Sequence, residues 1–226
     1  MFFALLSGLL GGTSSILYFE SVAGGPISIV GTVSATYPAW TAVIARLFLA
    51  EHLSPLQYVG VVVVILGCMG VAYEPSDKSD AGEKTTNRLW FLQANLAAAG
   101  WGVSGVVTDH AYELPNASEA NLVLFAFLGG VLTLGPYGLL RSRGRKFSQR
   151  EFTRGALPMA MFTVGNLLLT FAFRHGDATL VQTLSSPYPA ITLVFAFIIL
   201  KERPTFLQWV CIVLILVGMV LCPGVA

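Results

Sequence analysis

Two copies of one pattern of polar and aromatic residues supply the side chains best suited to contact a small solute. The pattern is serine, tyrosine and threonine at fixed spacing, and it comprises Ser34, Tyr37 and Thr41 and again Ser185, Tyr188 and Thr192. In a helix of 3.6 residues per turn, this spacing places the three side chains of each copy on one face. Hydroxyl groups donate and accept hydrogen bonds, and tyrosine adds an amphipathic ring. Two such faces would wall a binding cavity near the middle of a membrane.

A competing interpretation is that these hydroxyl groups only link one helix to another, which is common in membrane bundles. Tyrosine in both copies favours the cavity, because a bulky ring suits a solute contact better than close helix packing. Trp101 and Asn166 are further candidates for the cavity wall. For Asn166 the alternative is a plain hydrogen bond between helices, since an amide in lipid must face protein or a cavity.

Pro38 and Pro189 directly follow the two tyrosines and are predicted to bend their helices. Proline lacks an N–H and clashes with the preceding turn, so it frees a carbonyl group and kinks the helix. Each bend is either a hinge for conformational change or a static curve that shapes the bundle.

The sequence indicates no catalytic chemistry. It has no nucleophile paired with a base, no phosphate-binding loop and no metal-ligand cluster, so we expect neither an enzyme nor a cofactor or metal. The three cysteines, Cys68, Cys211 and Cys222, have the surroundings of packing residues. The basic residues between positions 141 and 154 favour an orientation signal over phosphate binding, and no nucleic-acid surface is indicated.

Composition places these residues in a membrane. Of 226 residues, 55% are hydrophobic and 11% are charged, whereas a soluble domain has about a quarter charged residues. Apolar stretches of about 20 residues recur, which is the length that crosses a bilayer. The predicted spans are Met1–Phe19, Ile27–Leu49, Tyr58–Ala72, Leu89–Val107, Ala120–Leu140, Ala156–Phe173, Ala178–Leu200 and Phe206–Leu221.

An internal duplication organises these spans. A shift of 151 positions aligns residues 25–67 with residues 176–218 without a gap, and about 17 of the 43 pairs are identical. The second span maps onto the seventh, five crossings later, so the two copies run in opposite directions through the membrane. We therefore predict an all-α polytopic membrane protein of about eight transmembrane helices with an inverted repeat, three plus five. Residues 1–72 form the partial first repeat, 73–88 a polar linker and 89–226 the second repeat.

Loop charges predict the orientation. Most lysines and arginines fall on one side of the predicted topology, leaving Arg46 and Arg174 on the other. The positive-inside rule makes the first side cytoplasmic and places both termini outside.

Several acidic residues lie near span ends. Glu20 and Asp109 are the best candidates for a proton-coupling carboxylate, although an interfacial position with snorkelling to the lipid headgroups is the favoured interpretation of both. Glu51 and Glu202 occupy matching repeat positions, which indicates that both anchor the end of a helix to a neighbouring loop.

The order of motifs resembles that of the EamA-type transporters of the drug/metabolite transporter superfamily. The motifs are Gly25-Pro26-Ile27-Ser28, Tyr37-Pro38-Ala39, Leu49-Ala50-Glu51 and Gln57-Tyr58-Val59-Gly60, echoed by Gly176-Asp177-Ala178, Pro189, Leu200-Lys201-Glu202 and Gln208. The resemblance implies ten helices in two inverted five-helix repeats, with a central cavity lined here by the first, second, sixth and seventh spans. It also implies cytoplasmic termini, which the loop charges contradict.

This chain has three spans where the first repeat of the family has five. Either it is an N-terminal truncation or it is a shortened member whose exposed flank a second subunit covers, for which a homodimer is the candidate. We expect alternating-access transport of a small organic metabolite or drug-like solute, with few charges, across a plasma or inner membrane. The alternative is a non-transporting membrane scaffold or regulatory subunit descended from a truncated transporter.

Overall fold

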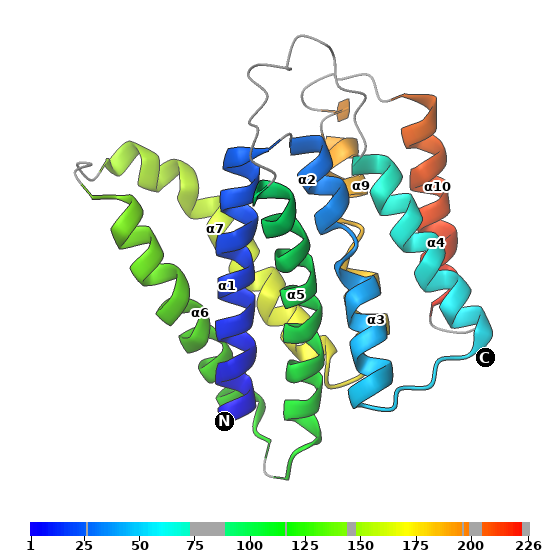
Figure 1. Cartoon of the computed structure of the whole chain (residues 1–226), viewed down its shortest axis with the longest axis horizontal. Helices are drawn as coiled ribbons and strands as arrows, with labels where there is room; N and C mark the ends of the chain where they lie inside the picture. The colour runs from blue at the N-terminus through cyan, green and yellow to red at the C-terminus, as the bar shows by residue number, and fades with distance from the viewer. Residues whose placement is uncertain are drawn as a thin grey trace.

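The chain is helical throughout the part that the computed structural model describes, which comprises residues 1–25, 27–72, 89–115, 117–143, 148–195, 197–198 and 205–222. Within these ranges no β-strand occurs, and ten α-helices follow one another (Figure 1). They are α1 (Phe2–Gly24), α2 (Ile27–Ser34), α3 (Tyr37–Phe48), α4 (Pro55–Ala72), α5 (Leu89–Glu113), α6 (Glu119–Arg141), α7 (Gln149–Ala172), α8 (Ala178–Ser185), α9 (Tyr188–Phe195) and α10 (Phe206–Leu221). The predicted all-α class is confirmed, while the predicted linker at 73–88 lies outside the described residues.

Two of the predicted spans are broken in the middle, and this corrects the expectation of continuous, bent helices. The span predicted over Ile27–Leu49 consists of α2 and α3, and the span predicted over Ala178–Leu200 contains α8 and α9. Taking each pair as one column gives eight helical columns. The breaks fall at repeat-related positions, 35–36 and 186–187, so the duplication extends to this irregular feature.

Proline explains both breaks. Pro38 and Pro189 have no N–H to donate to the carbonyl groups of Ser34 and Ser185, four residues earlier. The backbone tightens instead, because the Ala39 N–H donates to the Thr36 carbonyl oxygen over 2.9 Å, only three residues back. A proline also disfavours helical geometry at the residue before it. The second copy has an additional proline within the break itself, at position 187.

Length and apolar composition mark three of the described helical stretches as candidate membrane spans. These are Phe2–Gly24, Glu119–Arg141 and Gly155–Ala172. The apolar helices Pro55–Val71 and Phe206–Leu221 are shorter. The two broken columns, α2 with α3 and α8 with α9, do not meet this criterion, because each half-helix is shorter than the roughly 20 residues that cross a bilayer.

Small residues let the columns approach closely. A methyl group added at Gly8 of α1 would lie 1.9 Å from the Ala126 carbonyl oxygen of α6. One added at Gly12 would lie 1.8 Å from Thr133 Oγ1, also of α6. The small-xxx-small pair in α1 therefore forms the α1–α6 interface, and α1 packs equally closely on α5.

The α4–α10 interface shows the two-fold relation between the halves directly. A Cβ on Gly60 would lie 3.0 Å from the Gly218 carbonyl oxygen, and a Cβ on Gly67 would lie 3.0 Å from the Cys211 carbonyl oxygen. The shift of 151 positions converts Gly60 into Cys211 and Gly67 into Gly218. Each contact therefore becomes the other when the halves are exchanged, which is the signature of a two-fold axis between α4 and α10.

The remaining long helix, α7, is less closely packed. It makes sparse contacts with α6 and α8, and none of the residues of its apolar stretch whose side chains the structure describes is buried. In the view of Figure 1 it passes behind α1 and α5. Its counterpart by chain order is α1, which is packed between α5 and α6. One flank of the second repeat is therefore open.

Candidate solute-binding site

The two tyrosines of the repeated pattern meet across the helix breaks. The hydroxyl of Tyr37, in the first turn of α3, lies 3.1 Å from Ser185 Oγ and 3.2 Å from the Gln182 carbonyl oxygen at the end of α8. The hydroxyl of Tyr188, in the first turn of α9, forms a side-chain hydrogen bond with Ser34 at the end of α2. The shift of 151 converts one Tyr–Ser pair into the other. The structure thus brings together four of the predicted site residues.

The two pairs differ in accessibility. Ser34 is fully buried and Tyr37 is 8% exposed, whereas Tyr188 is 43% exposed and Ser185 is also exposed. Thr41 is fully buried one turn beyond Tyr37, where its Oγ1 donates to the Tyr37 carbonyl oxygen over 3.2 Å. The first copy of the pattern is therefore buried, and the second copy is the accessible side of the site.

Aromatic rings extend the site towards α1 and α5. Trp101 of α5 packs edge-on against Tyr37, with ring centroids 6.3 Å apart and planes at 77°. Its other neighbour is Tyr18 of α1, at 5.4 Å. The structure therefore places Trp101 beside the paired breaks. The sequence did not indicate Tyr18 as a site residue, because Tyr18 lies outside the aligned repeat and has no matching tyrosine in the other half.

Glycines on α5 allow the broken helices to come this close. A Cβ on Gly102 would lie 2.9 Å from the Thr41 backbone nitrogen of α3, and one on Gly105 would lie 2.2 Å from Gln182 Nε2 of α8. The backbone carbonyl oxygen of Gln182 accepts the hydrogen bond from the Tyr37 hydroxyl. The sequence did not indicate Gln182 as a site residue either. Its repeat counterpart is Gly31, so the pairwise identity that revealed the other residues is absent there.

Other predicted site residues are placed less centrally. Asn166 lies on the sparsely packed α7, where its Nδ2 donates to the Phe162 carbonyl oxygen of its own helix over 2.9 Å. The structure does not join it to the paired tyrosines, and its role in the cavity stays a prediction. The side chain of Thr192 lies outside the described residues. Pro38 and Pro189 each occupy the second position of a half-helix, directly at the breaks.

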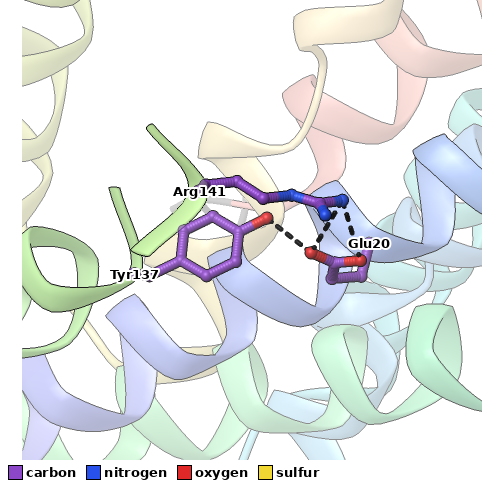
Figure 2. Close-up of polar contacts among 3 residues, drawn as sticks. All are labelled: Glu20, Tyr137 and Arg141. Carbon is purple, nitrogen blue, oxygen red and sulfur yellow. Dashed lines mark hydrogen bonds and ion pairs between the residues drawn. The ribbon is translucent and has the colours of Figure 1, made fainter. Parts of the chain in front are cut away.

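Glu20 is held at the end of α1 by two residues of α6. Figure 2 shows its carboxylate accepting a 2.7 Å hydrogen bond from the Tyr137 hydroxyl and contacting the Arg141 guanidinium at 3.3 Å. Glu119, at the opposite end of α6, pairs with Arg174, which lies two residues beyond the end of α7. These contacts with Tyr137 and Arg141 give Glu20 the surroundings of an interfacial anchor.

Asp109 lies in the last turns of α5, at the end of the bundle away from Glu20. The charged groups that act on it are Glu113, Glu51 and Asp177, all acidic. Neither Glu20 nor Asp109 lies at the paired breaks. The assignment of either as a proton carrier stays a prediction.

Glu51 anchors the end of α3, as the sequence predicted, but its partner is the first turn of α8 and not a neighbouring loop. Ala50 adopts a φ of 53°, a left-handed turn that alanine rarely makes. The following carboxylate accepts hydrogen bonds from the Thr179 N–H, at 3.2 Å, and from the Thr179 hydroxyl. These bonds satisfy a free N–H of the first turn of α8. Glu202, the repeat counterpart, lies outside the described residues.

The surroundings of Glu51 predict a pH dependence of stability. Burial raises the pKa of its carboxyl, more than the bonds from Thr179 lower it. A carboxyl whose pKa is higher in the folded state contributes stability that is complete below its unfolded pKa and lost as pH rises through the folded pKa. We expect the free energy of unfolding to decrease as pH rises above the ordinary range of a glutamate, and Glu51→Gln to reduce this slope.

The measurement is thermal or denaturant unfolding of the detergent-solubilised protein across that pH range. Glu51→Ala is the control for the hydrogen bonds, since losing a helix cap costs about 1 kcal/mol at any pH. An unchanged slope in Glu51→Gln would assign the pH dependence to another group.

The class of protein follows from this geometry. The molecule is a polytopic helical membrane protein whose two halves repeat in opposite orientation and meet at mid-column helix breaks, an arrangement used by membrane transporters. A model of the EamA-like transporter family matches residues 1–73 and 88–222. The chain belongs to the EamA-like transporter family, a family of transporters rather than of enzymes, and the resemblance seen in the sequence is confirmed.

Individual relatives agree with this membership. An uncharacterised transporter of Archaeoglobus fulgidus is 25% identical over 203 residues, which cover 90% of this chain and 67% of that protein. An uncharacterised protein of Methanocaldococcus jannaschii is 38% identical over 73 residues, which cover 32% of this chain and 53% of that protein. The match thus spans about half the length of the second relative.

Several solved structures share the fold, and one of them is a crystal structure that covers nearly all of this chain. It superposes with a TM-score of 0.71 at 17% sequence identity, covering 96% of this chain and 74% of the other. At this identity the likeness concerns the fold alone.

Proposed function

We propose that this chain moves a small organic metabolite or drug-like solute across the membrane by alternating access about the paired helix breaks. The observation that carries the proposal is the reciprocal pair of hydrogen bonds, Tyr37 with Ser185 and Tyr188 with Ser34. Because the two pairs are related by an inverted repeat, the halves can exchange inward-open and outward-open packings at little net cost. The solute would bind against these tyrosines and Trp101.

Two further features belong to this proposal. The protein would act as a multi-pass protein of a plasma or inner membrane, with Glu20 or Asp109 as the carboxylate that couples proton movement to transport. A second subunit would cover the open flank along α7, and a homodimer is the simplest way to provide it. The wide exposure of α7 favours such a partner.

That same exposure is the observation in favour of the second candidate function. A chain whose second repeat lacks neighbours on one side could serve as a non-transporting scaffold or regulatory subunit, with α7 bound to another membrane protein. Solute flux in liposomes that contain only this chain separates the two functions.

The test is counterflow into proteoliposomes with a panel of radiolabelled amino acids and aromatic amines. We expect the wild type to accumulate at least one of them. Tyr37→Phe and Tyr188→Phe should each reduce the rate about fivefold, because one hydrogen bond contributes about 1 kcal/mol. Tyr58→Phe is the matched control, since Tyr58 lies in the first turn of α4, away from the breaks. Wild-type rates in both break variants would contradict the assignment of the site.

A further inference from the structure

We propose that the site at the paired helix breaks recognises a protonated amine, through the carbonyl-rich ends of α2 and α8 and the aromatic rings around them. This inference rests on the proposed function, because it names the chemical class of the solute bound at that site. It follows from three properties of the site: an excess of hydrogen-bond acceptors, electron-rich ring faces and the absence of positive side chains.

The backbone at the breaks offers more acceptors than donors. The last carbonyl groups of a helix have no donor within it, and α2 and α8 both end at the site. Gly31, Val33, Gln182 and Thr183 accept local hydrogen bonds there, whereas the carbonyl groups of Ser34 and Ser185 lose their helical donors to Pro38 and Pro189. The first turns of α3 and α9 would normally supply free N–H groups as donors, but Pro38 and Pro189 each remove one N–H group. Two of the donors that remain are used locally, because the Thr36 N–H donates to Val33 over 3.1 Å and the Ser186 N–H donates to Thr183 over 3.2 Å.

The hydroxyl groups add to this excess, since their protons are already committed to backbone carbonyl oxygens. Ser34 Oγ donates to Gly31 over 3.0 Å, and Ser185 Oγ donates to Gln182 over 2.9 Å. What the exposed Ser185 hydroxyl can offer a solute is therefore a lone pair. Thr183, in the last turn of α8, is fully buried, and its Oγ1 has no hydrogen-bond partner within the described part of the chain. An ammonium group carries three donors and no acceptor, so it complements such a set.

The aromatic rings favour the same charge. Cations within about 6 Å of a ring are attracted to its face, most strongly to that of tryptophan. Trp101 lies among Tyr18 and Tyr37, with Tyr188 on the accessible side. The edge-on contact of Tyr37 on Trp101 turns the two ring planes 77° apart, so the rings present faces in different directions.

An anionic solute would lack partners here. Neither lysine nor arginine occurs in α1, α2, α5, α8 or α9, and the arginine of α3, Arg46, lies in its last turn. Binding a carboxylate or phosphate within a membrane asks for such a residue or for a row of free N–H groups. The exposure of Ser185 and Tyr188 leaves the site reachable from one side.

The test compares three probes that share one ring and differ in charge: phenethylamine, 2-phenylethanol and phenylacetate. Binding to the purified chain in lipid nanodiscs is measured by tryptophan fluorescence and by the shift in thermal unfolding. We expect phenethylamine to bind at least tenfold more tightly than the other two. Trp101→Phe should weaken its binding about tenfold, while Trp209→Phe, on α10, should leave it unchanged.

Phenylacetate or 2-phenylethanol binding as tightly as phenethylamine would overturn the inference, as would amine binding that is unaffected by Trp101→Phe. Failure of the transport proposal gives a different result. Trp101-dependent amine binding without flux of any solute would support the amine site and reject transport. Flux of an anionic or neutral solute without amine binding would support transport and reject the amine site.

Discussion

Replacing Gly218 with alanine should lower the free energy of unfolding by about 3 kcal/mol, at the upper end of the cost of overpacking. The added methyl group would lie 2.9 Å from the Gly60 carbonyl oxygen and 2.9 Å from the Val64 backbone nitrogen. Backbone atoms cannot rotate away as side chains do, so α4 and α10 would have to separate. Because these helices carry the two-fold axis, the separation would loosen both halves.

The measurement for Gly218→Ala is unfolding in mixed micelles, followed by circular dichroism. Gly135→Ala and Gly138→Ala of α6 are matched controls, because a methyl group at either position meets nothing within 4 Å. There the same substitution should stabilise the helix by up to about 1 kcal/mol. Equal stabilities of Gly218→Ala and the controls would show that the α4–α10 contact is looser than described.

The double variant Pro38→Ala with Pro189→Ala should reduce solute flux at least tenfold while the protein remains folded. Alanine restores an N–H that can donate to the carbonyl oxygens of Ser34 and Ser185, so the first column can continue as one helix, while the second keeps only the interruption at Pro187. A continuous helix lacks the freed backbone groups at the centre and resists bending there. The loss of flux would identify the breaks as hinges.

Flux and thermal stability are measured on the same proteoliposome preparations. Pro136→Ala is the control, because Pro136 lies within the continuous helix α6. If the double variant transports at the wild-type rate, the prolines only shape a static curve, which is the other interpretation of the sequence.

The duplication made much of this fold predictable. Pairwise identity over 43 positions located the tyrosine–serine pattern and implied its inversion, and the structure then joined Tyr37 to Ser185 and Tyr188 to Ser34 across the breaks. The anchoring role of Glu51 was predicted in the same way, because a residue retained at matching positions in both halves carries a shared constraint.

The remaining features of the fold and of the site depend on contacts between residues that are not identical in the two halves. A proline in a span indicates a disturbed helix, but whether the helix bends or breaks depends on the hydrogen bonds that surrounding helices can offer. Tyr18 and Gln182 have no identical counterpart, and their place in the site follows from how α1 and α8 pack on α5. Asn166 was predicted from polarity alone, and polarity does not determine which way a sparsely packed helix faces.

The exchange of contacts across α4 and α10 has an energetic consequence. In the alternating-access cycle that we propose, the repeated helices of the two halves swap roles, so a perturbation in one half favours one state over the other. A cost of about 1.4 kcal/mol placed on one state shifts the balance tenfold. Substitutions at repeat-related positions, such as Ser34→Ala and Ser185→Ala, should therefore shift the resting population in opposite directions. Each variant should close the site towards the opposite face of the membrane from the other.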